Sequence, residues 1–569
     1  MKNVKNLFGM AVMATALVGC SSNDNLNPNP NDNAGKAGTA YAKFTIQLPT
    51  VSGTRADDDP KPGTPFFEGG TADEYAVKDA QLVIFQKIGD SDPEGAYKFV
   101  ETVNIGNLEP WTNNTPNTGV TRYANITAQL NGVSLGGNEY FALIILNNGS
   151  ESKVKLPTTG MTYSEWNVAA KANGAAAFLN SDNGFYMANA PLYSTGEPTT
   201  LVPIKGVYST KAEAQNKPAT TVYVERGMAK VTIGSSTFDA DKPVTTSTNY
   251  AGDMVTITNW TLDVLNKTTF PVHVTTGLKT DFDAIWTTPR FVATGSTPQR
   301  VYWGKDPNYD KSTLTTVAAC QDEFYIVDNN GKTYNGDPSS TFTWSEKATP
   351  LYCLENTFDI NNMKQGQTTR VLFKATYTPA AVASETDKTF FMIGNNPKIW
   401  TMTTLKQQIT NKVQELLKST SVSVTINDDA NLLKAGSHKV TAADITITGT
   451  TASLNYDELN TKLGLDNTPG IKTYKNGECY YIARIKHFNE LTPWASGQDL
   501  YGGNNVKYLG RYGVLRNNWY DLTVSKVSAP GYPDVPEVKP ETADDEDTKY
   551  INVEVKILDW AKRSQSIDL

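Results

Sequence analysis

Cysteine and histidine carry the most specific side-chain chemistry, and both are scarce in this sequence of 569 residues. The three histidines, His273, His438 and His487, lie far apart, so a metal site built on several histidines is not expected. Gly132-Val-Ser-Leu-Gly136 has the spacing of a nucleophile elbow, but a strand follows it where a helix is needed, so it predicts a hairpin turn. No paired catalytic constellation is recognisable. The sequence therefore predicts no enzyme, no metal and no cofactor.

Cys20 is the cysteine whose neighbours predict a reaction. The chain begins with two lysines in its first five residues, continues with an apolar stretch at 7–18, and so starts as a secretory signal does. The run Leu17-Val-Gly-Cys20 resembles the bacterial lipobox, which is cleaved before a cysteine that then receives lipid (palmitate). We expect a signal peptide at 1–19 and lipid chains on Cys20 that hold the protein at a membrane. The alternative is an ordinary signal with an incidental cysteine.

The other cysteines, Cys320, Cys353 and Cys479, are separated by long stretches and include no CxxC pair. A disulfide framework is therefore not indicated. Buried unpaired thiols are favoured, and a single disulfide pair is left open.

The composition favours strands joined by turns. Hydrophobic residues make up 39% and charged residues 19% of the chain, below the averages of roughly 45–50% and 25% for globular proteins. Threonine, asparagine, glycine and serine fill the difference. The net charge of −8 argues against a nucleic-acid surface, and no apolar run reaches the ~18–20 residues of a spanning helix. The sequence thus predicts a mostly β protein that does not bind nucleic acid.

Both ends of the chain carry a strand with alternating apolar residues, which neither could keep as an isolated strand. These residues are Ala42, Phe44, Ile46 and Leu48 near the N-terminus, and Ile551, Val553, Val555 and Ile557 near the C-terminus. Arg55 follows the first strand in a turn-rich loop and is the only arginine among the first 121 residues. The Arg55–Ala56 bond is therefore a candidate for proteolysis.

Together, these features predict strand exchange. Cleavage after Arg55 would release the first strand and open an apolar groove, which the C-terminal strand of another copy would fill. Each large apolar side chain contributes ~1.5–3 kcal/mol on burial, so the four donor residues would contribute on the order of 6–12 kcal/mol. Because donor and acceptor surfaces differ, the contact is head-to-tail and produces open filaments. The alternative is that both strands belong to sheets of their own molecule.

The chain divides into a signal peptide (1–19), a propeptide with a polar tether and the first strand (20–55), an N-terminal domain (56–220), a C-terminal domain (221–529) and a tail (530–569). Strands are expected at 81–86, 97–103, 122–129, 140–147 and 202–208, a cluster of strands at 221–233, and helices at 161–171 and 405–417. Residues 530–548 hold four prolines and seven acids against one lysine, which predicts a stiff, extended linker with a solvated acidic run at 544–547.

The sequence resembles the Bacteroidales-type fimbrillins, the major subunits of type V pili, and is most similar to the short-fimbria Mfa-type major subunit. The resemblance rests on the lipobox, on Ser52–Asp57, Val224–Lys230 and Gly513–Val524, and on the tail from Val553 to Leu569. Arg516, within the fourth of these stretches, either braces the base of the tail or forms a surface pair.

The resemblance implies two tandem transthyretin-like β-sandwich domains and export as an outer-membrane lipoprotein. It also implies trimming by an Arg-specific protease at Arg55–Ala56 and polymerisation through the C-terminal donor strand. Stalk subunits have both a cleavable first strand and a donor tail, so a stalk subunit of a cell-surface fimbrium that supports adhesion is expected. Its partners would be other copies of itself, related fimbrial subunits and a host or bacterial surface ligand.

Two other functions stay open. One is a tip or adhesin subunit of the same pilus. The other is a monomeric outer-membrane glycan-binding lipoprotein, which would keep its lipid and first strand and expose an aromatic platform. In a strand-rich protein, however, aromatic residues usually belong to the core or to cross-strand pairs.

Overall fold

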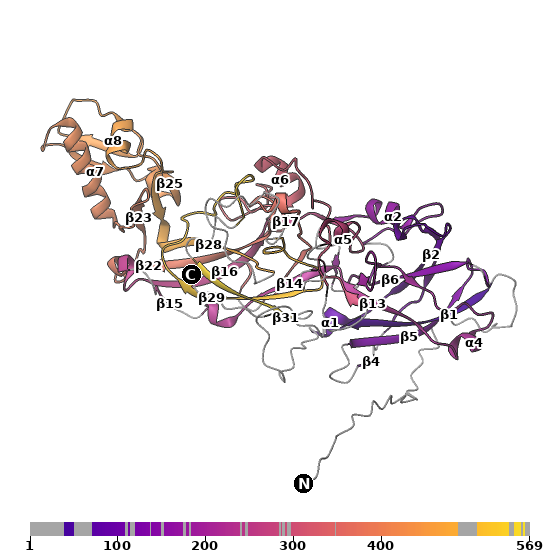
Figure 1. The fold of residues 1–569 in the computed structure, drawn as a ribbon. Helices are drawn as coiled ribbons and strands as arrows, with labels where there is room; N and C mark the ends of the chain where they lie inside the picture. The colour runs from indigo at the N-terminus through magenta and orange to yellow at the C-terminus, as the bar shows by residue number, and fades with distance from the viewer. Residues whose placement is uncertain are drawn as a thin grey trace, which may run out of the picture.

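The structure is a computed structural model of an elongated, mostly β molecule (Figure 1). It describes residues 39–49, 71–108, 112–113, 120–136, 138–149, 153–173, 178–180, 184–238, 242–244, 248–283, 286, 291–292, 298–346, 349–487, 509–544, 551–558 and 562–563. Cys20, Arg55 and Ala56 lie outside these residues, as do the predicted signal peptide and the acids at 545–547. Within the described ranges, no helix is long and apolar enough to cross a membrane.

The N-terminal part of the chain forms a sheet of nine strands around one apolar core. The strands run in the order β3-β2-β6-β10-β13-β1-β5-β4, and β12 also pairs with β6. Their bounds are β1 Ala40–Pro49, β2 Ala80–Lys87, β3 Lys98–Asn104, β4 Thr112–Asn113, β5 Val120–Leu130, β6 Glu139–Leu146, β10 Met187–Asn189, β12 Val202–Pro203 and β13 Thr220–Arg226. β1 thus lies inside the sheet, with a neighbour on each edge.

The C-terminal part forms two larger sheets that share a second core. One has the order β21-β14-β29-β30-β31 and the other β15-β16-β22-β28. Their bounds are β14 Met228–Ile233, β15 Lys242–Pro243, β16 Met254–Asp263, β21 Leu351–Leu354, β22 Arg370–Thr378, β28 Glu478–Arg484, β29 Trp519–Val527, β30 Ile551–Leu558 and β31 Lys562–Arg563. The assignment of both domains as transthyretin-like sandwiches stays a prediction.

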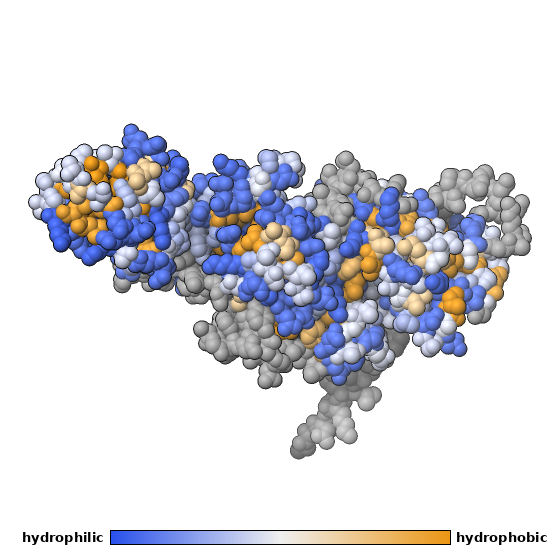
Figure 2. Space-filling view, turned by 90° about the horizontal axis from the view of Figure 1, so that it is seen from above, coloured by the Kyte–Doolittle hydropathy of each residue, from blue (hydrophilic) through white to orange (hydrophobic). Residues whose placement is uncertain are grey.

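A separate module, residues 379–477, is inserted between β22 and β28, which pair directly with each other. It contains β23 Phe390–Ile393, α7 Met402–Leu417, β24 Ser423–Ile426, β25 Gly436–His438, β26 Ile445–Thr448, α8 Tyr456–Lys462 and β27 Ile471–Tyr474. Leu405, Ile409 and Val413 of α7 enter a core that belongs to the module alone. The module projects from one end of the molecule (Figure 1) and forms a separate lobe in the space-filling view (Figure 2).

Short elements connect these sheets. The helices are α1 Ala72–Tyr75, α2 Tyr163–Ala169, α4 Lys211–Gln215, α5 Leu278–Asp281 and α6 Val317–Glu323. The short strands are β7 Ala172–Asn173, β8 Leu179–Asn180, β9 Gly184–Phe185, β11 Leu192–Tyr193, β17 Leu265–Asn266, β18 Thr268–Thr269, β19 Gln299–Arg300 and β20 Phe324–Tyr325. Thr162 and Glu165 form a capping box that fixes the start of α2, since each side chain accepts from the other's backbone N–H.

Most predicted elements are confirmed, and two expectations are wrong. The strand cluster expected at 221–233 is present as β13, which ends at Arg226, and β14, which begins at Met228. The strand expected at 202–208 is reduced to Val202–Pro203. The segment at 132–136 joins β5 to β6, but these two strands do not pair, so it is no hairpin turn.

Gly227 lies between β13 and β14, at a position where a side chain would collide with the core. A Cβ at this position would lie 2.6 Å from the Phe178 ring and 2.9 Å from the Tyr186 ring. β13 belongs to the N-terminal sheet and β14 to the C-terminal sheet, so the chain changes sheets at Gly227. The domain boundary predicted at 220/221 stays a prediction, and the change of sheet lies a few residues beyond it.

Candidate assembly strands and the joint between domains

The predicted displaced strand occupies the interior of the N-terminal sheet. β1 pairs antiparallel with β5 from Ala40 to Pro49, and parallel with β13 from Phe44 to Gln47. Ala42, Phe44 and Ile46 are 0% exposed. Leu48 is buried as well. The alternation seen in the sequence is therefore an alternation of core and surface, as expected for a half-buried strand.

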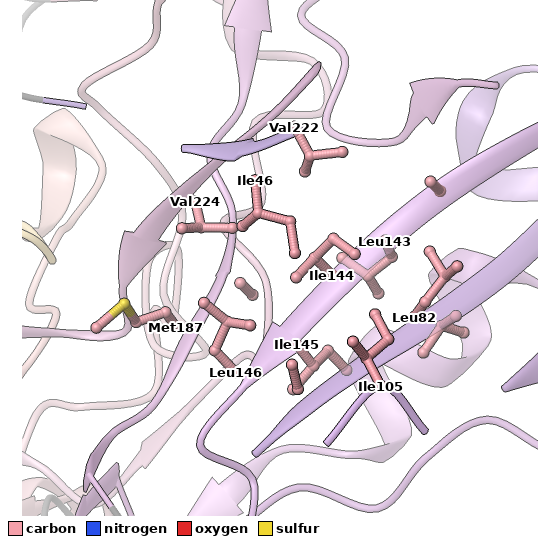
Figure 3. Close-up of a cluster of buried hydrophobic side chains, with 14 of the residues drawn as sticks. Ile46, Leu82, Ile105, Leu143, Ile144, Ile145, Leu146, Met187, Val222 and Val224 are labelled. Atoms are coloured by element: carbon pink, nitrogen blue, oxygen red, sulfur yellow. The ribbon is translucent and has the colours of Figure 1, made fainter. Parts of the chain in front are cut away.

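The core around Ile46 shows what β1 contributes to packing. Figure 3 shows Ile46 beside Val222 and Val224 of β13, with Leu143 and Ile144 of β6 opposite. These residues are buried and belong to the same cluster. Removing β1 would therefore uncover an apolar groove between β5 and β13.

The other face of β1 makes polar contacts with neighbouring elements. Thr45 Oγ1 donates to Asn125 Oδ1 of β5 at 2.7 Å, and Lys43 Nζ donates to the Gln215 carbonyl at the end of α4 at 3.0 Å. Tyr41 pairs through its backbone with Tyr208. These groups are near the surface, where net hydrogen-bond contributions are small. The apolar face of β1 therefore provides most of its attachment.

The predicted donor strand lies at the opposite end of the sequence and pairs within its own molecule. β30 is antiparallel to β29, and Ile551, Val553, Val555 and Ile557 lie opposite Val527, Val524, Leu522 and Tyr520. The two-residue strand β31 follows on its other edge. Both terminal strands thus belong to sheets of the same molecule, which is the arrangement that the alternative hypothesis describes. Exchange between molecules stays a prediction.

The segment before the tail is packed on the domain, so the prediction of a free linker from residue 530 is wrong. Val535 and Val538 are buried, and Tyr532 pairs through its backbone with Tyr480. Gln365 N–H donates to the Thr542 carbonyl at 2.9 Å. Asp544 is 0% exposed, which also corrects the expectation that it belongs to a solvated run. Composition suggested repulsion, but two of the acids have cationic partners: Glu541 lies 3.0 Å from Lys364 Nζ, and Asp544 lies 3.6 Å from Arg511 Nη2.

Two arginines hold this segment by its backbone. Arg370 Nη2 donates to the Pro536 carbonyl at 2.8 Å while its Nε lies 2.7 Å from Asp263 Oδ2. Arg484 Nε donates to the Asp544 carbonyl at 2.9 Å. The point from which the tail leaves the domain is therefore Asp544, and residues 545–550 alone separate it from β30.

A buried row of alternating charges joins the N-terminal sheet to the C-terminal part of the chain. Arg300, Glu225, His273, Glu355 and Arg516 follow one another in space, and Glu225 is the member from the N-terminal sheet. His273 Nδ1 lies 3.0 Å from Glu225 Oε1 and Nε2 lies 3.1 Å from Glu355 Oε1. Arg300 Nη2 is 2.9 Å from Glu225, and Arg516 Nε is 3.1 Å from Glu355. Each buried carboxylate thus has two cationic neighbours.

These contacts fix the ionisation of the row. Burial alone lowers the pKa of His273, but the charges of Glu355 and Glu225 raise it to about 9. Burial alone raises the pKa of Glu355, but His273 and Arg516 lower it to about 2. The pKa of Glu225 is also lowered, since His273 and Arg300 outweigh its burial. His273 is therefore charged at neutral pH, and both carboxylates are ionised.

A second set of contacts attaches α1 to the C-terminal sheet. Glu74 of α1 lies 2.7 Å from Lys230 Nζ on β14 and accepts from the Tyr352 hydroxyl of β21 at 2.6 Å. Arg226 Nε donates to the Glu74 carbonyl at 2.7 Å. Lys230 also lies over the Trp519 ring at 3.9 Å. The charged row and this set together form what we call the joint.

Sequence reasoning missed the joint, although two of the stretches that carried the family resemblance contribute to it. Glu225, Arg226 and Lys230 lie in Val224–Lys230, and Arg516 and Trp519 lie in Gly513–Val524. Arg516 also donates from Nη2 to the Phe270 carbonyl at 3.1 Å, so it is no surface pair and it braces the joint. One signal was available in the sequence: Glu225 and Arg226 stand beside Gly227 within a run of apolar strand residues.

The remaining predicted sites are of two kinds: those outside the described residues and the three cysteines that the structure describes. Cys20, Arg55 and Ala56 lie outside the described residues, and so their roles stay predictions. Cys320, Cys353 and Cys479 are free and buried, as favoured from the sequence. The described residues hold no cluster of three or more histidine, cysteine or acidic side chains that could bind a metal ion.

A family model connects the C-terminal strands to a known group of proteins. The model described as major fimbrial subunit protein type IV, fimbrillin, C-terminal, matches residues 472–566, which include β28, β29 and β30. This region is fimbrillin-like. The match confirms the resemblance to fimbrillins that the sequence motifs indicated. No curated protein sequence matches the chain.

Solved structures with a related course of the chain come from Bacteroidales. A proposed cell adhesion protein of Parabacteroides distasonis is 11% identical over 93% of this chain and 99% of its own, with a TM-score of 0.37. A fimbrial assembly protein of the same species is 10% identical over 63% and 92%, with a TM-score of 0.25. The tip fimbrial protein Mfa3 of Porphyromonas gingivalis, with a C-terminal truncation, is 11% identical over 91% and 100%, with a TM-score of 0.27.

The fimbrillin match has direct consequences for the coarser predictions. Fimbrillins are subunits of cell-surface fimbria, in which they assemble with other fimbrial subunits. Their role is structural and not enzymatic. The predictions of a fimbrial subunit, of a surface location and of no enzymatic function therefore agree with the match.

Proposed function

We propose that the chain is a fimbrial stalk subunit that is exported as an outer-membrane lipoprotein through Cys20, trimmed after Arg55 and polymerised by exchange of its C-terminal strand. The observation that carries this proposal is β1, an interior strand whose apolar face is fully buried. Its loss leaves a groove that only another alternating strand can fill. β30 has the required alternation, and its family match is to fimbrillins.

The position of Arg55 suits selective release of β1. Arg55 lies between β1 and α1 in the sequence, and each of these elements is fixed to a different part of the molecule. α1 is attached to the C-terminal sheet by Glu74, which contacts Lys230 of β14 and Tyr352 of β21. Cutting at Arg55–Ala56 therefore separates β1 and the lipid from the body while the residues from α1 onward stay attached.

The groove would accept the donor strand by the same contacts that now hold β1. Ile551, Val553, Val555 and Ile557 would take the places of Ala42, Phe44, Ile46 and Leu48, or of a neighbouring register. The backbone groups of β5 and β13 that pair with β1 would pair with the donor, so no buried backbone group loses its partner. Assembly then exchanges one set of strand contacts for another and needs no external energy source.

The division into domains at 56–220 and 221–529 is kept in this proposal. Its supporting observation is that the sheet changes near this boundary, at Gly227. The joint gives the two domains a fixed relation, which suits a subunit whose donor strand and acceptor groove lie in different sheets of the molecule (Figure 1).

The test compares the full chain with two variants after treatment with an arginine-specific endopeptidase. Denaturant-resistant multimers should form from the full chain, whereas Arg55→Ala should stay monomeric and keep its first strand. Deletion of residues 551–569 should permit trimming but abolish multimers. Multimers from the deletion variant would refute the donor role of β30, and multimers from uncut Arg55→Ala would refute the trigger. A trimmed full chain that stays monomeric would favour the tip subunit over the stalk.

A further inference from the structure

Arginine and lysine are used differently in this chain. The sequence contains 41 lysines but only ten arginines, at positions 55, 122, 226, 290, 300, 370, 484, 511, 516 and 563. The structure describes six of these arginine side chains, and all six are at most 8% exposed. Among the described lysines, only Lys153 and Lys230 are buried. Since both residue types are normally found at the surface, the burial of every described arginine is a departure from the ordinary pattern.

The buried arginines are held by fixed polar partners. Arg226, Arg370, Arg484 and Arg516 each donate to at least one backbone carbonyl. Arg300 contacts Glu225, as described above for the joint. An endopeptidase that selects arginine must take this side chain into a pocket of its own. It can do so here only after these contacts and the surrounding core have opened.

Two further arginines lie in strands whose backbone pairing the structure describes. Arg122 is an internal residue of β5 and pairs with both Leu48 and Asn113. Arg563 pairs with Ile557 in the hairpin of β30 and β31. Strand pairing hinders the extended binding that proteolysis requires.

We propose that the body of this subunit is specifically resistant to arginine-selective endopeptidases because all six arginine side chains that the structure describes are buried, so that such an enzyme is confined to the Arg55–Ala56 bond. The inference rests on the proposed trimming at Arg55 and adds the reason why the same enzyme does not destroy the subunit. The surface obtains its positive charge from lysine instead. We therefore expect the trimming enzyme to select arginine, because an enzyme that also accepts lysine would cut the body at its exposed lysines.

The first test exposes the native full chain to an arginine-specific endopeptidase and, separately, to a lysine-specific one, with mass spectrometry of the products. Arginine-specific cleavage should occur at Arg55, and cleavage at each buried arginine should be at least about 100-fold slower. The lysine-specific enzyme should cut the body at exposed lysines, including Lys418 after α7 and Lys332 in the turn at 328–333. Resistance of the body to both enzymes would overturn the inference, because the fold alone would then explain it.

The second test moves arginine to the surface without changing charge. Lys418→Arg and Lys332→Arg should each create a new site for the arginine-specific enzyme, with unchanged unfolding temperature. If both variants resist cleavage at the new arginine, placement of arginine is not what protects the body. If wild type is cut at one of the six buried arginines as fast as at Arg55, the inference also fails. An intact body that is not cut at Arg55 would instead refute the proposed trimming and leave the inference standing.

Discussion

β1 and β30 both alternate apolar and polar residues, yet they occupy different positions in their sheets. β1 has β5 along its whole length, β13 on its other edge and a buried apolar face. Among the described residues, β30 has β29 on one edge and the two residues of β31 on the other. An interior strand with a buried apolar face cannot leave without opening a core, whereas β30 lies near a sheet edge. We therefore expect that a cut is needed to release the first strand.

The largest expected effect tests the first half of this comparison. Phe44→Ala should lower the free energy of unfolding of the uncut chain by about 3–5 kcal/mol, because a fully buried aromatic side chain is lost and leaves a cavity. Denaturant unfolding measures it. Thr45→Ala, on the partly exposed face of the same strand, is the matched control and should cost about 1 kcal/mol. Equal effects of the two substitutions would contradict the interior position of β1.

The joint predicts the next largest effect, a dependence of stability on pH. It bears on the groove because β13 carries both Val222, in the groove wall, and Glu225, in the joint. The pKa of His273 is raised to about 9 from an ordinary 6.5, so its stabilising contribution is complete below pH 6.5 and is lost as pH rises through 9. The loss is on the order of 3 kcal/mol. Calorimetric unfolding temperatures between pH 6 and 10 measure it.

His273→Gln is the control for that pH dependence. The variant should be less stable at pH 6 and should lose less stability between pH 6 and 10 than wild type does. The lowered pKa of Glu355, about 2, adds a separate loss on the acid side, since its contribution is complete above 4.5 and falls toward pH 2. Parallel alkaline curves for wild type and His273→Gln would show that His273 does not carry the effect.

A smaller effect tests the base of the tail. Arg484→Gln removes the donors to the carbonyls of Asp544 and Thr368, which costs about 1.5–3 kcal/mol because both hydrogen bonds come from a charged group. The yield of polymer after trimming should also fall in this variant, because the segment before the tail is then less firmly attached to the domain. Hydrogen exchange at residues 536–544 is the direct measurement. Unchanged protection there would show that the segment is held by its apolar residues alone.

The smallest effect is expected at the exposed ion pair of the same segment. Lys364 Nζ lies 3.0 Å from Glu541, whose side chain is more than half exposed. Glu541→Gln should change stability by at most about 1 kcal/mol, because exposed pairs contribute little and are screened by salt. Denaturant unfolding at low and high salt measures this. An effect as large as that of Arg484→Gln would mean that charge, and not the buried donors, holds the segment.

The strands at both ends were predictable because a period of two in apolar residues is a local signal. The same holds for α7, where Leu405, Ile409 and Val413 recur at helical spacing and reach the module core. The break at Gly227 was harder to see, since an unbroken apolar run continues through it. Only the approach of Phe178 and Tyr186, which come from elsewhere in the sequence, makes glycine necessary there.

The docked segment before the tail and the joint could not be predicted from local pattern. The prolines and acids at 530–544 indicate a linker by composition. The sequence does not show that Arg370 and Arg484, which are distant along the chain, bind the backbone of this segment. Glu225, His273 and Glu355 are separated by tens of residues, and each alone is an ordinary polar residue. Long-range pairing of charges leaves no periodic trace, so the joint becomes visible only in three dimensions.

The inserted module has a mechanical consequence. Because β22 and β28 pair directly beneath it, tension along the sheet passes from one strand to the other without crossing residues 379–477. The module can therefore grow, shrink or be replaced as a side branch while the path of tension through β22 and β28 stays the same. In the fibre that we propose, surface residues of this module can vary without weakening the connection between subunits.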